Sequence, residues 1–301
     1  MTAQFVISLL CFAAGFGSQK LQVAGEKAVS VLSSLISWVL LPAVIVAAMS
    51  QLHLSRDVML LPAANVFVVG TLLAIAALAA RFFGVKRQTA GAAVIAFGTL
   101  EGGSIGLALV LSLFGTKLLP QFFVFDIVHA LLLFTVTYLV ACLYGAQGKL
   151  SGKLVRDFLL GPIPMAVIAG LALNVSGVHL NAAIASVLNA AGYLILPAVL
   201  GILGLRFTFR KEYLAISLAL TFAKIVLGYL IALGFVLLFE PSSASRAVIL
   251  LSSCLPPSFL TLIFAQERKL DSGFLATFLP VSALVSFTVL YATFELFPAL
   301  L

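Results

Sequence analysis

Residues 98–115 read GTLEGGSIGLALVLSLFG, and this stretch decides how the chain folds. It lies in an apolar run long enough to cross a bilayer, yet its centre holds a carboxylate, Glu101, followed by several glycines. A charge at the bilayer centre costs about 2.5–3.5 kcal/mol on insertion scales, and glycine specifies a helix weakly. Non-helical backbone at this depth survives only inside protein or beside a watery cavity. The stretch therefore predicts a broken helix next to an internal site.

The composition indicates an integral membrane protein. Of the 301 residues, 63% are hydrophobic and only 9% are charged, whereas a soluble domain has about 25% charged residues. The net charge of +7 is therefore a matter of topology, and we expect no nucleic-acid partner. Enzyme motifs and metal-ligand spacings are missing from the sequence, which predicts a non-enzymatic protein without a cofactor.

Ten apolar stretches have about the 20 residues that a membrane-spanning helix needs. Thirteen of the 17 Lys and Arg residues follow odd-numbered stretches and three follow even-numbered ones, which places the loops after odd-numbered spans in the cytoplasm and both termini outside. The remaining one, Lys224, lies in the middle of the eighth stretch. The ten are 2–19, 29–50, 58–82, 88–115, 119–143, 158–177, 181–205, 213–238, 245–265 and 272–299.

An internal repeat relates the two halves of the chain. WVLLPAVI at 38–45 matches YLILPAVL at 193–200, and FTVTY at 134–138 matches FTVLY at 287–291, at nearly the same offset. We expect a first five-helix repeat, a connecting cytoplasmic loop and a second repeat, with the bounds 1–143, 144–157 and 158–301. Because five is odd, the second copy is inverted, as in many secondary transporters.

The repeat places Pro256 and Pro257, in SSCLPPSFL, at the position equivalent to Glu101. Proline removes a backbone donor and clashes with the preceding turn, so this helix is expected to break as well. The two broken helices are predicted to cross at a central site.

The chain resembles the auxin efflux carrier family of membrane transporters along essentially its whole length. The resemblance rests on Leu41-Pro42, on FGTLEGGSIGLALVLSLFG (97–115), on FDIVHALLLF (125–134) and on CLPPSFLTLIFAQERKLD (254–271). It implies an all-α fold of ten transmembrane helices in two inverted five-helix repeats, with helices 4 and 9 broken and crossing at the midplane. Helices 1, 2, 6 and 7 would form a scaffold that dimerises through helices 2 and 7, and helices 3–5 and 8–10 a moving transport domain.

The resemblance further implies elevator-type transport of a small organic anion across a bacterial inner membrane. The chain departs from the family pattern at Glu101, where an Asn is usual, and at Gly106-Leu107-Ala108, where GLP is common. A carboxylate at the crossing favours proton or cation coupling, or a substrate with a positive group. A sodium-coupled symporter of the bile acid type, and a channel or sensor on the same fold, are the alternatives.

Ionisable residues inside the spans complete the predicted site. Asp126 and His129 are three residues apart and share a helix face, where they can bond to each other and relay a proton. Lys224 is too deep to snorkel, so it needs a carboxylate or loses its proton. The candidate coupling residues are Glu101, Asp126 and His129. The candidate substrate-binding residues are Glu101, Gly102, Gly103, Ser104, Lys224, Pro256, Pro257, Ser258 and Asn65.

Overall fold

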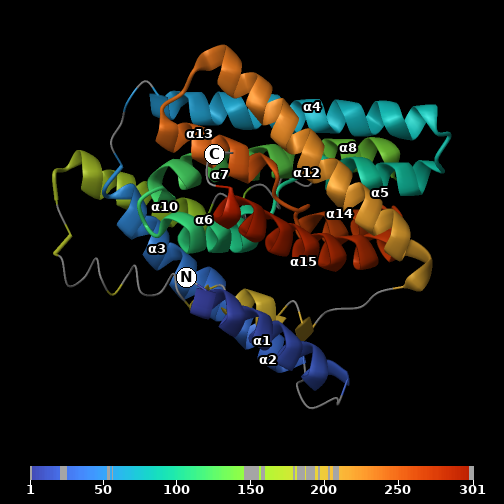
Figure 1. The fold of residues 1–301 in the computed structure, drawn as a ribbon, viewed down its shortest axis with the longest axis horizontal. Helices are drawn as coiled ribbons and strands as arrows, with labels where there is room; N and C mark the ends of the chain where they lie inside the picture. Colours follow the sequence, from blue (N-terminus) through green and yellow to red (C-terminus); the bar gives the residue numbers. More distant parts are fainter. Residues whose placement is uncertain are drawn as a thin grey trace. The chain divides into compact units, whose positions relative to one another are not determined.

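In the computed structural model, every regular element among the described residues is a helix, and none of these residues forms a strand (Figure 1). These residues are 2–20, 26–52, 57–145, 160–178 and 210–297, together with positions 55 and 156 and separate residues between 180 and 205. Most of the predicted connecting loop 144–157 and most of the predicted span 181–205 lie outside them.

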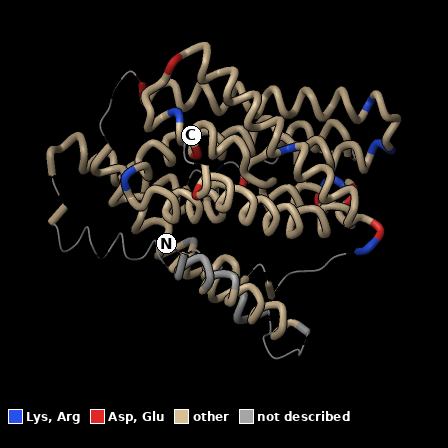
Figure 2. Tube along the Cα trace, viewed as in Figure 1, with Lys and Arg blue, Asp and Glu red and all other residues tan. Residues whose placement is uncertain are grey.

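Five helical stretches are long and apolar enough to cross a membrane. They are Asp57–Phe82, Arg87–Phe114, Leu119–Tyr144, Lys211–Phe239 and Ser272–Leu296. Two further apolar helices, Trp38–Met49 and Pro162–Val175, are shorter. In Figure 2 most of the charged residues lie near the ends of helices, which leaves long uncharged stretches between them. The chain is therefore an all-α membrane protein.

The described chain divides into two compact units. Unit 1 comprises residues 1–54, 103–123 and 157–207, and unit 2 comprises 55–102, 124–156 and 208–301. The division separates the segments that hold predicted helices 1, 2, 6 and 7 from most of the segments that hold predicted helices 3–5 and 8–10. Residues 103–123, from the fourth and fifth predicted helices, belong to unit 1.

Unit 1 holds the N-terminal helices and α10. Its best-defined contact joins α3 and α10, where the Asn174 side chain donates hydrogen bonds to the main-chain oxygens of Ser50 and Leu52, each at 2.9 Å. Gly170 permits the close approach, because a Cβ there would lie 2.6 Å from the Cβ of Met49. The elements are α1 (Thr2–Lys20), α2 (Glu26–Leu35), η1 (Ile36–Leu40), α3 (Leu41–Met49), α6 (Leu107–Phe114) and α10 (Pro162–Val175).

Unit 2 is a bundle of long helices and several shorter ones. Its main packing partners are α12 with α15, α4 with α5, and α12 with α13. Its elements are η2 (Asp57–Met59), α4 (Leu60–Phe82), α5 (Arg87–Phe97), η4 (Leu133–Thr137), α8 (Tyr138–Tyr144), α12 (Lys211–Phe239), α13 (Ser243–Ser253), α14 (Leu260–Glu267) and α15 (Ser272–Leu296). Two elements run from one unit into the other, η3 (Gly102–Gly106) and α7 (Leu119–Leu132).

Side-chain bonds tie together the start of α5, the end of α8 and the start of α15. Arg87 donates to the main-chain oxygens of Leu143 and Tyr144, at 2.7 and 3.1 Å. Thr89 donates to the carboxylate of Asp271 at 2.8 Å. These bonds join segments far apart in sequence, so they hold the ends of these three helices of unit 2 together.

A second cluster at the same end links α8 to α14. The Tyr138 hydroxyl bonds the Glu267 carboxylate at 2.7 Å and accepts from Arg268, whose guanidinium lies over the tyrosine ring at 4.9 Å from its centroid. Arg268 and Tyr138 are both buried. A buried guanidinium is costly unless it is paired, so the hydroxyl is an essential member of this cluster.

Tyr138→Phe should therefore lower the free energy of unfolding by about 1–3 kcal/mol, because hydrogen bonds to charged groups are lost inside the protein. Thermal unfolding in detergent measures the change. Tyr213→Phe is the matched control, since the Tyr213 ring packs on Phe274 while its hydroxyl has no hydrogen bond among the described residues. Equal melting temperatures for the two variants would contradict the role given to the hydroxyl.

Candidate functional site

Two helices of unit 2 break in equivalent ways. α5 ends at Phe97 and α13 ends at Ser253, and each is followed by a short non-helical segment, 98–101 and 254–259. The two helices before the breaks both have 11 residues. Beyond the first break η3, of 5 residues, runs directly into α6, of 8 residues, and beyond the second break α14 has 8 residues. The first interruption lies at 98–101, directly before the glycines of the π-helix η3 (Gly102–Gly106), and the second contains Pro256 and Pro257.

The two non-helical segments are bonded to each other. The main-chain N–H of Glu101 donates to the oxygen of Pro256 at 2.7 Å, and the N–H of Ser258 donates to the Thr99 hydroxyl at 3.2 Å. Pro256 and Pro257 have no N–H of their own, so this stretch leaves fewer donors to satisfy. The bonds bring both broken helices to one point in the interior of unit 2.

Glu101 places its carboxylate at the start of α14. Its Oε2 accepts a hydrogen bond from the main-chain N–H of Phe259 at 3.1 Å, directly before the first residue of the helix. The N-terminus of a helix carries a partial positive charge, which favours a carboxylate there. The amide that a bound anion would use is thus already occupied by a side chain of the protein.

Lys224 of α12 lies at the C-terminal end of α5, whereas Glu101 lies at the N-terminal end of α14. The Lys224 ammonium is 1% exposed and donates to the main-chain oxygen of Phe97, the last residue of α5, at 2.7 Å. The partial negative charge at a helix C-terminus stabilises a cation. Among the described residues Lys224 forms no ion pair with Glu101 or Asp126. Its partner is a main-chain oxygen and not the carboxylate that the sequence analysis considered.

His129 is buried and bonds the main chain at the first break. Its Nε2 accepts from the N–H of Leu100 at 3.1 Å, so the ring is neutral and its proton is on Nδ1. Nδ1 has no partner among the described residues. Among the described residues no hydrogen bond joins His129 to Asp126, so the predicted pair does not form. The histidine bonds the main chain at Leu100 instead.

Asp126 packs directly against Gly102. A Cβ built on Gly102 would lie 1.6 Å from Asp126 Oδ1, so only glycine lets the carboxylate reach this position. Asp126 and Glu101 thereby bring two carboxyl groups to the same break, one packed against Gly102 and the other on the residue directly before it.

Gly102→Ala should displace the Asp126 carboxylate while leaving the fold intact, because the clashing atom is the end of a side chain that can rotate. Because the displaced carboxylate would no longer repel an anion at the break, we expect the affinity for an anion to rise several-fold and thermal stability to change by less than about 1 kcal/mol. Isothermal titration and thermal unfolding measure the two effects. Gly70→Ala on α4, where a Cβ meets nothing within 4 Å, is the control. An unchanged affinity in Gly102→Ala would show that the position of Asp126 does not matter.

The other predicted residues divide into three groups. Pro256, Pro257 and Ser258 lie in the second non-helical segment, within the bonded crossing. Asn65 on α4 is fully buried, and neither amide atom has a partner among the described residues. Gly103 and Ser104 belong to unit 1.

Sequence reasoning missed the groups that act through the main chain. The oxygen of Phe97 and the N–H groups of Leu100 and Phe259 each bind a functional side chain. Main-chain groups carry no residue-type signal, and the only hint in the sequence was that helices break nearby.

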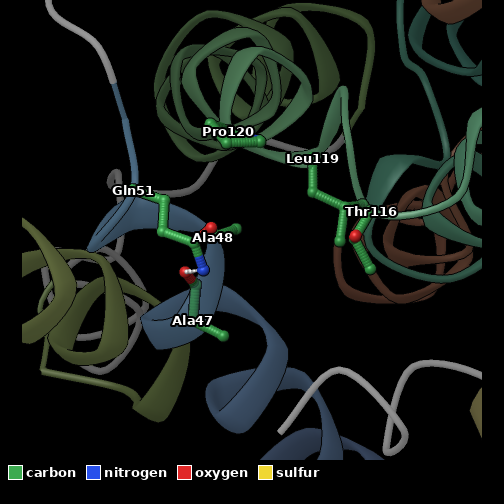
Figure 3. A pocket seen from close by; sticks show the side chains of 6 residues that line it. All are labelled: Ala47, Ala48, Gln51, Thr116, Leu119 and Pro120. Atoms are coloured by element: carbon green, nitrogen blue, oxygen red, sulfur yellow. Dashed lines mark hydrogen bonds between the residues drawn. The ribbon is translucent and has the colours of Figure 1, made fainter. Parts of the chain in front are cut away.

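A small pocket of about 30 Å³ lies in unit 1, between the end of α3 and the turn before α7 (Figure 3). Gln51 lines it and bonds back to Ala47 at 3.2 Å. None of the predicted site residues lines this pocket, and its volume suits a water molecule rather than an organic substrate.

Comparison with known proteins agrees with the membrane character of the fold. A family model described as membrane transport protein, Mem_trans, matches residues 1–292. Among curated proteins, none matches the chain.

Proposed function

Because the chain belongs to the membrane transport protein family, which includes the auxin efflux carriers, we propose that this transporter carries a small organic anion by secondary, proton-linked transport. The observation that carries the proposal is the Glu101 carboxylate on the Phe259 amide, at the positive end of a broken helix. A helix N-terminus of this kind is also the natural binding place for a substrate carboxylate. Glu101 and the substrate therefore compete for one amide.

Protonation of Glu101 resolves this competition. The protonated side chain is a weaker acceptor and carries no charge, so it releases the Phe259 amide to the substrate. When the proton leaves, Glu101 returns to the amide and the anion dissociates. Binding of the anion thus requires uptake of one proton, so the anion and the proton would be carried together in the same direction.

The charges around the crossing support the same coupling. When both carboxyl groups are ionised, Glu101 and Asp126 contribute two negative charges, the protonated Lys224 contributes one positive charge and His129 is neutral through its bond to Leu100. The set has a net charge of −1 when both carboxyl groups are ionised, and an anion would then be repelled. One bound proton removes the excess, and a second leaves Lys224 as the dominant charge.

The division of the chain into two units supports an elevator-type movement. We propose that unit 2, with the crossing inside it, carries the substrate across the cytoplasmic membrane of a bacterium while unit 1 stays fixed in the bilayer. Homodimerisation would take place through unit 1, where Trp38 and Val39 of η1 are exposed. Native mass spectrometry in lipid discs tests the dimer.

Glu101→Gln tests the coupling in purified protein and in proteoliposomes. In the unsubstituted protein, binding of a transported carboxylate should tighten as the pH falls. Glu101→Gln keeps the side chain neutral at every pH, so we expect tighter binding at neutral pH, a weaker dependence of binding on pH and flux that no longer follows a pH gradient. Flux that remains fully gradient-driven in this variant would refute proton coupling through Glu101.

Replacing sodium in the same assay distinguishes proton coupling from the alternative, a sodium-coupled symporter. Transport that stops when choline replaces sodium, at constant pH gradient, would identify sodium as the coupling ion. Unchanged flux in choline is the expected result.

A further inference from the structure

The turn between α4 and α5, residues 81–87, exposes two aromatic side chains that the proposed transport cycle does not use. Phe82 is 84% exposed and Phe83 is 76% exposed, the largest fractions among the described aromatic residues. Their rings meet edge-on, with the centroids 5.3 Å apart. In Figure 1 this turn closes the end of unit 2 at which α4 leads into α5. The pair is an apolar surface that no described part of the chain covers.

Main-chain bonds hold this turn in one conformation. The N–H of Gly84 donates to the oxygen of Arg81 at 3.3 Å. The N–H of Val85 donates to the oxygen of Ala80 at 3.2 Å. Together they form the Schellman motif that ends many helices, and Gly84 has the positive φ of 61° that this motif favours. The backbone therefore fixes where the two rings leave the helix.

The length of α4 places the turn at the edge of the hydrocarbon layer. Residues 60–80 carry no charge and span about 31 Å at a rise of 1.5 Å per residue, close to the thickness of about 30 Å of that layer. Arg81 follows directly, so its guanidinium lies at the level of the lipid headgroups. Phe82 and Phe83 then lie at the boundary between the headgroups and the acyl chains.

Two cations of the turn have no partner in the part of the chain that the structure describes. Arg81 and Lys86 are exposed, and neither side chain forms a hydrogen bond or an ion pair with a described residue. Arg87 differs, because it donates to main-chain oxygens at the end of α8. Figure 2 shows basic residues on both sides of the turn and no acidic residue within it.

Acidic side chains that could neutralise these cations are missing from the turn and occupied nearby. No Asp or Glu occurs within residues 58–100. Asp271 contacts the start of α5, but its carboxylate bonds Thr89 at 2.8 Å and caps its own helix, α15. At the start of α12, by contrast, Arg210 lies 3.7 Å from Glu212. The negative counter-charge of the turn must therefore come from outside the described chain.

We propose that the α4–α5 turn binds an anionic phospholipid of the leaflet that it faces. Phe82 and Phe83 enter the part of the acyl-chain layer next to the headgroups, while Arg81 and Lys86 contact the negatively charged headgroup. Aromatic side chains combined with cations are typical of segments that bind the interface of an anionic membrane. The turn has no carboxylate for the ammonium group of a zwitterionic headgroup, which favours a lipid with a net negative charge. Each cation near such a surface strengthens binding about five-fold.

Quenching of tryptophan fluorescence by brominated lipids tests this site. Trp38 is the only tryptophan of the chain, so Phe83→Trp combined with Trp38→Phe places a single fluorophore in the turn. The protein is reconstituted in phosphatidylcholine in which about one-fifth of the lipid is brominated phosphatidylglycerol or, for comparison, brominated phosphatidylcholine. We expect the anionic lipid to quench at least twice as strongly. Adding Arg81→Gln and Lys86→Gln should bring this ratio close to one.

A matched pair of substitutions separates the site from general attraction of lipid to a basic protein. Arg210→Gln with Lys211→Gln removes the same charge from the start of α12 and should leave the ratio unchanged. An equal loss of the ratio in both double variants would overturn the proposal. So would weak quenching at position 83 by either lipid, because protein would then cover the rings. No substrate is present, so the result does not depend on the outcome of the Glu101→Gln assay.

Discussion

Gly228→Ala should destabilise the protein more than any other single methyl addition on α12. A Cβ at Gly228 would lie 2.1 Å from the main-chain oxygen of Ser253 and 2.9 Å from its carbon. These are backbone atoms at the C-terminus of α13, so no side chain can rotate away and the two helices must separate. Overpacking of this kind costs about 1–3 kcal/mol, and thermal unfolding in detergent measures it.

The effect should extend to function, because Ser253 immediately precedes the non-helical segment that bonds Glu101. Gly234→Ala, six residues further along the same helix, is the control, since a Cβ there meets nothing within 4 Å. This control should be neutral or slightly stabilising, as alanine favours the helix. If both variants unfold at the same temperature, the close packing of α12 on α13 does not limit stability.

Lys224→Met should have the largest effect on substrate binding. Methionine keeps the length and apolar character of the side chain but removes the positive charge, which leaves the carboxyl groups of Glu101 and Asp126 without a cation at the crossing. An ammonium and a substrate carboxylate 4 Å apart would attract each other by about 4 kcal/mol at an effective dielectric constant of 20. We therefore expect the affinity for an anionic substrate to fall at least ten-fold, as measured by isothermal titration.

The matched control for this prediction is Lys211→Met, at the exposed start of the same helix. It removes an equal charge far from the break and should leave the affinity within two-fold. Retained affinity in Lys224→Met would show that the lysine serves only to hold the last turn of α5. Melting temperatures distinguish this outcome, because loss of the bond to Phe97 lowers them without a change in binding.

The sequence allows the membrane fold and the location of the breaks to be predicted, because apolar length, glycine and proline act locally. Glu101 and Pro256 were placed together by the repeat, and the structure bonds their main chains. The partners of Lys224 and His129 could not be predicted in this way. Both bind main-chain atoms distant in sequence, and a carbonyl or amide has the same chemistry at every residue.

The position of Asp126 shows a second limit. Its spacing from His129 suggested a pair on one helix face, yet the carboxylate packs on Gly102 and the histidine bonds Leu100. Helical spacing fixes which side chains are neighbours along one helix. It does not determine which neighbouring helix offers a better partner, and here a glycine supplied the space.

The bond between Glu101 and Pro256 uses main-chain atoms only. The two broken helices therefore stay joined whatever side chain stands at position 101, and the chemistry of the crossing can change without loosening its architecture. A single substitution there can exchange a carboxylate for an amide or a hydroxyl on an unaltered frame. Selectivity in such a transporter can diversify one residue at a time, with the scaffold inherited intact.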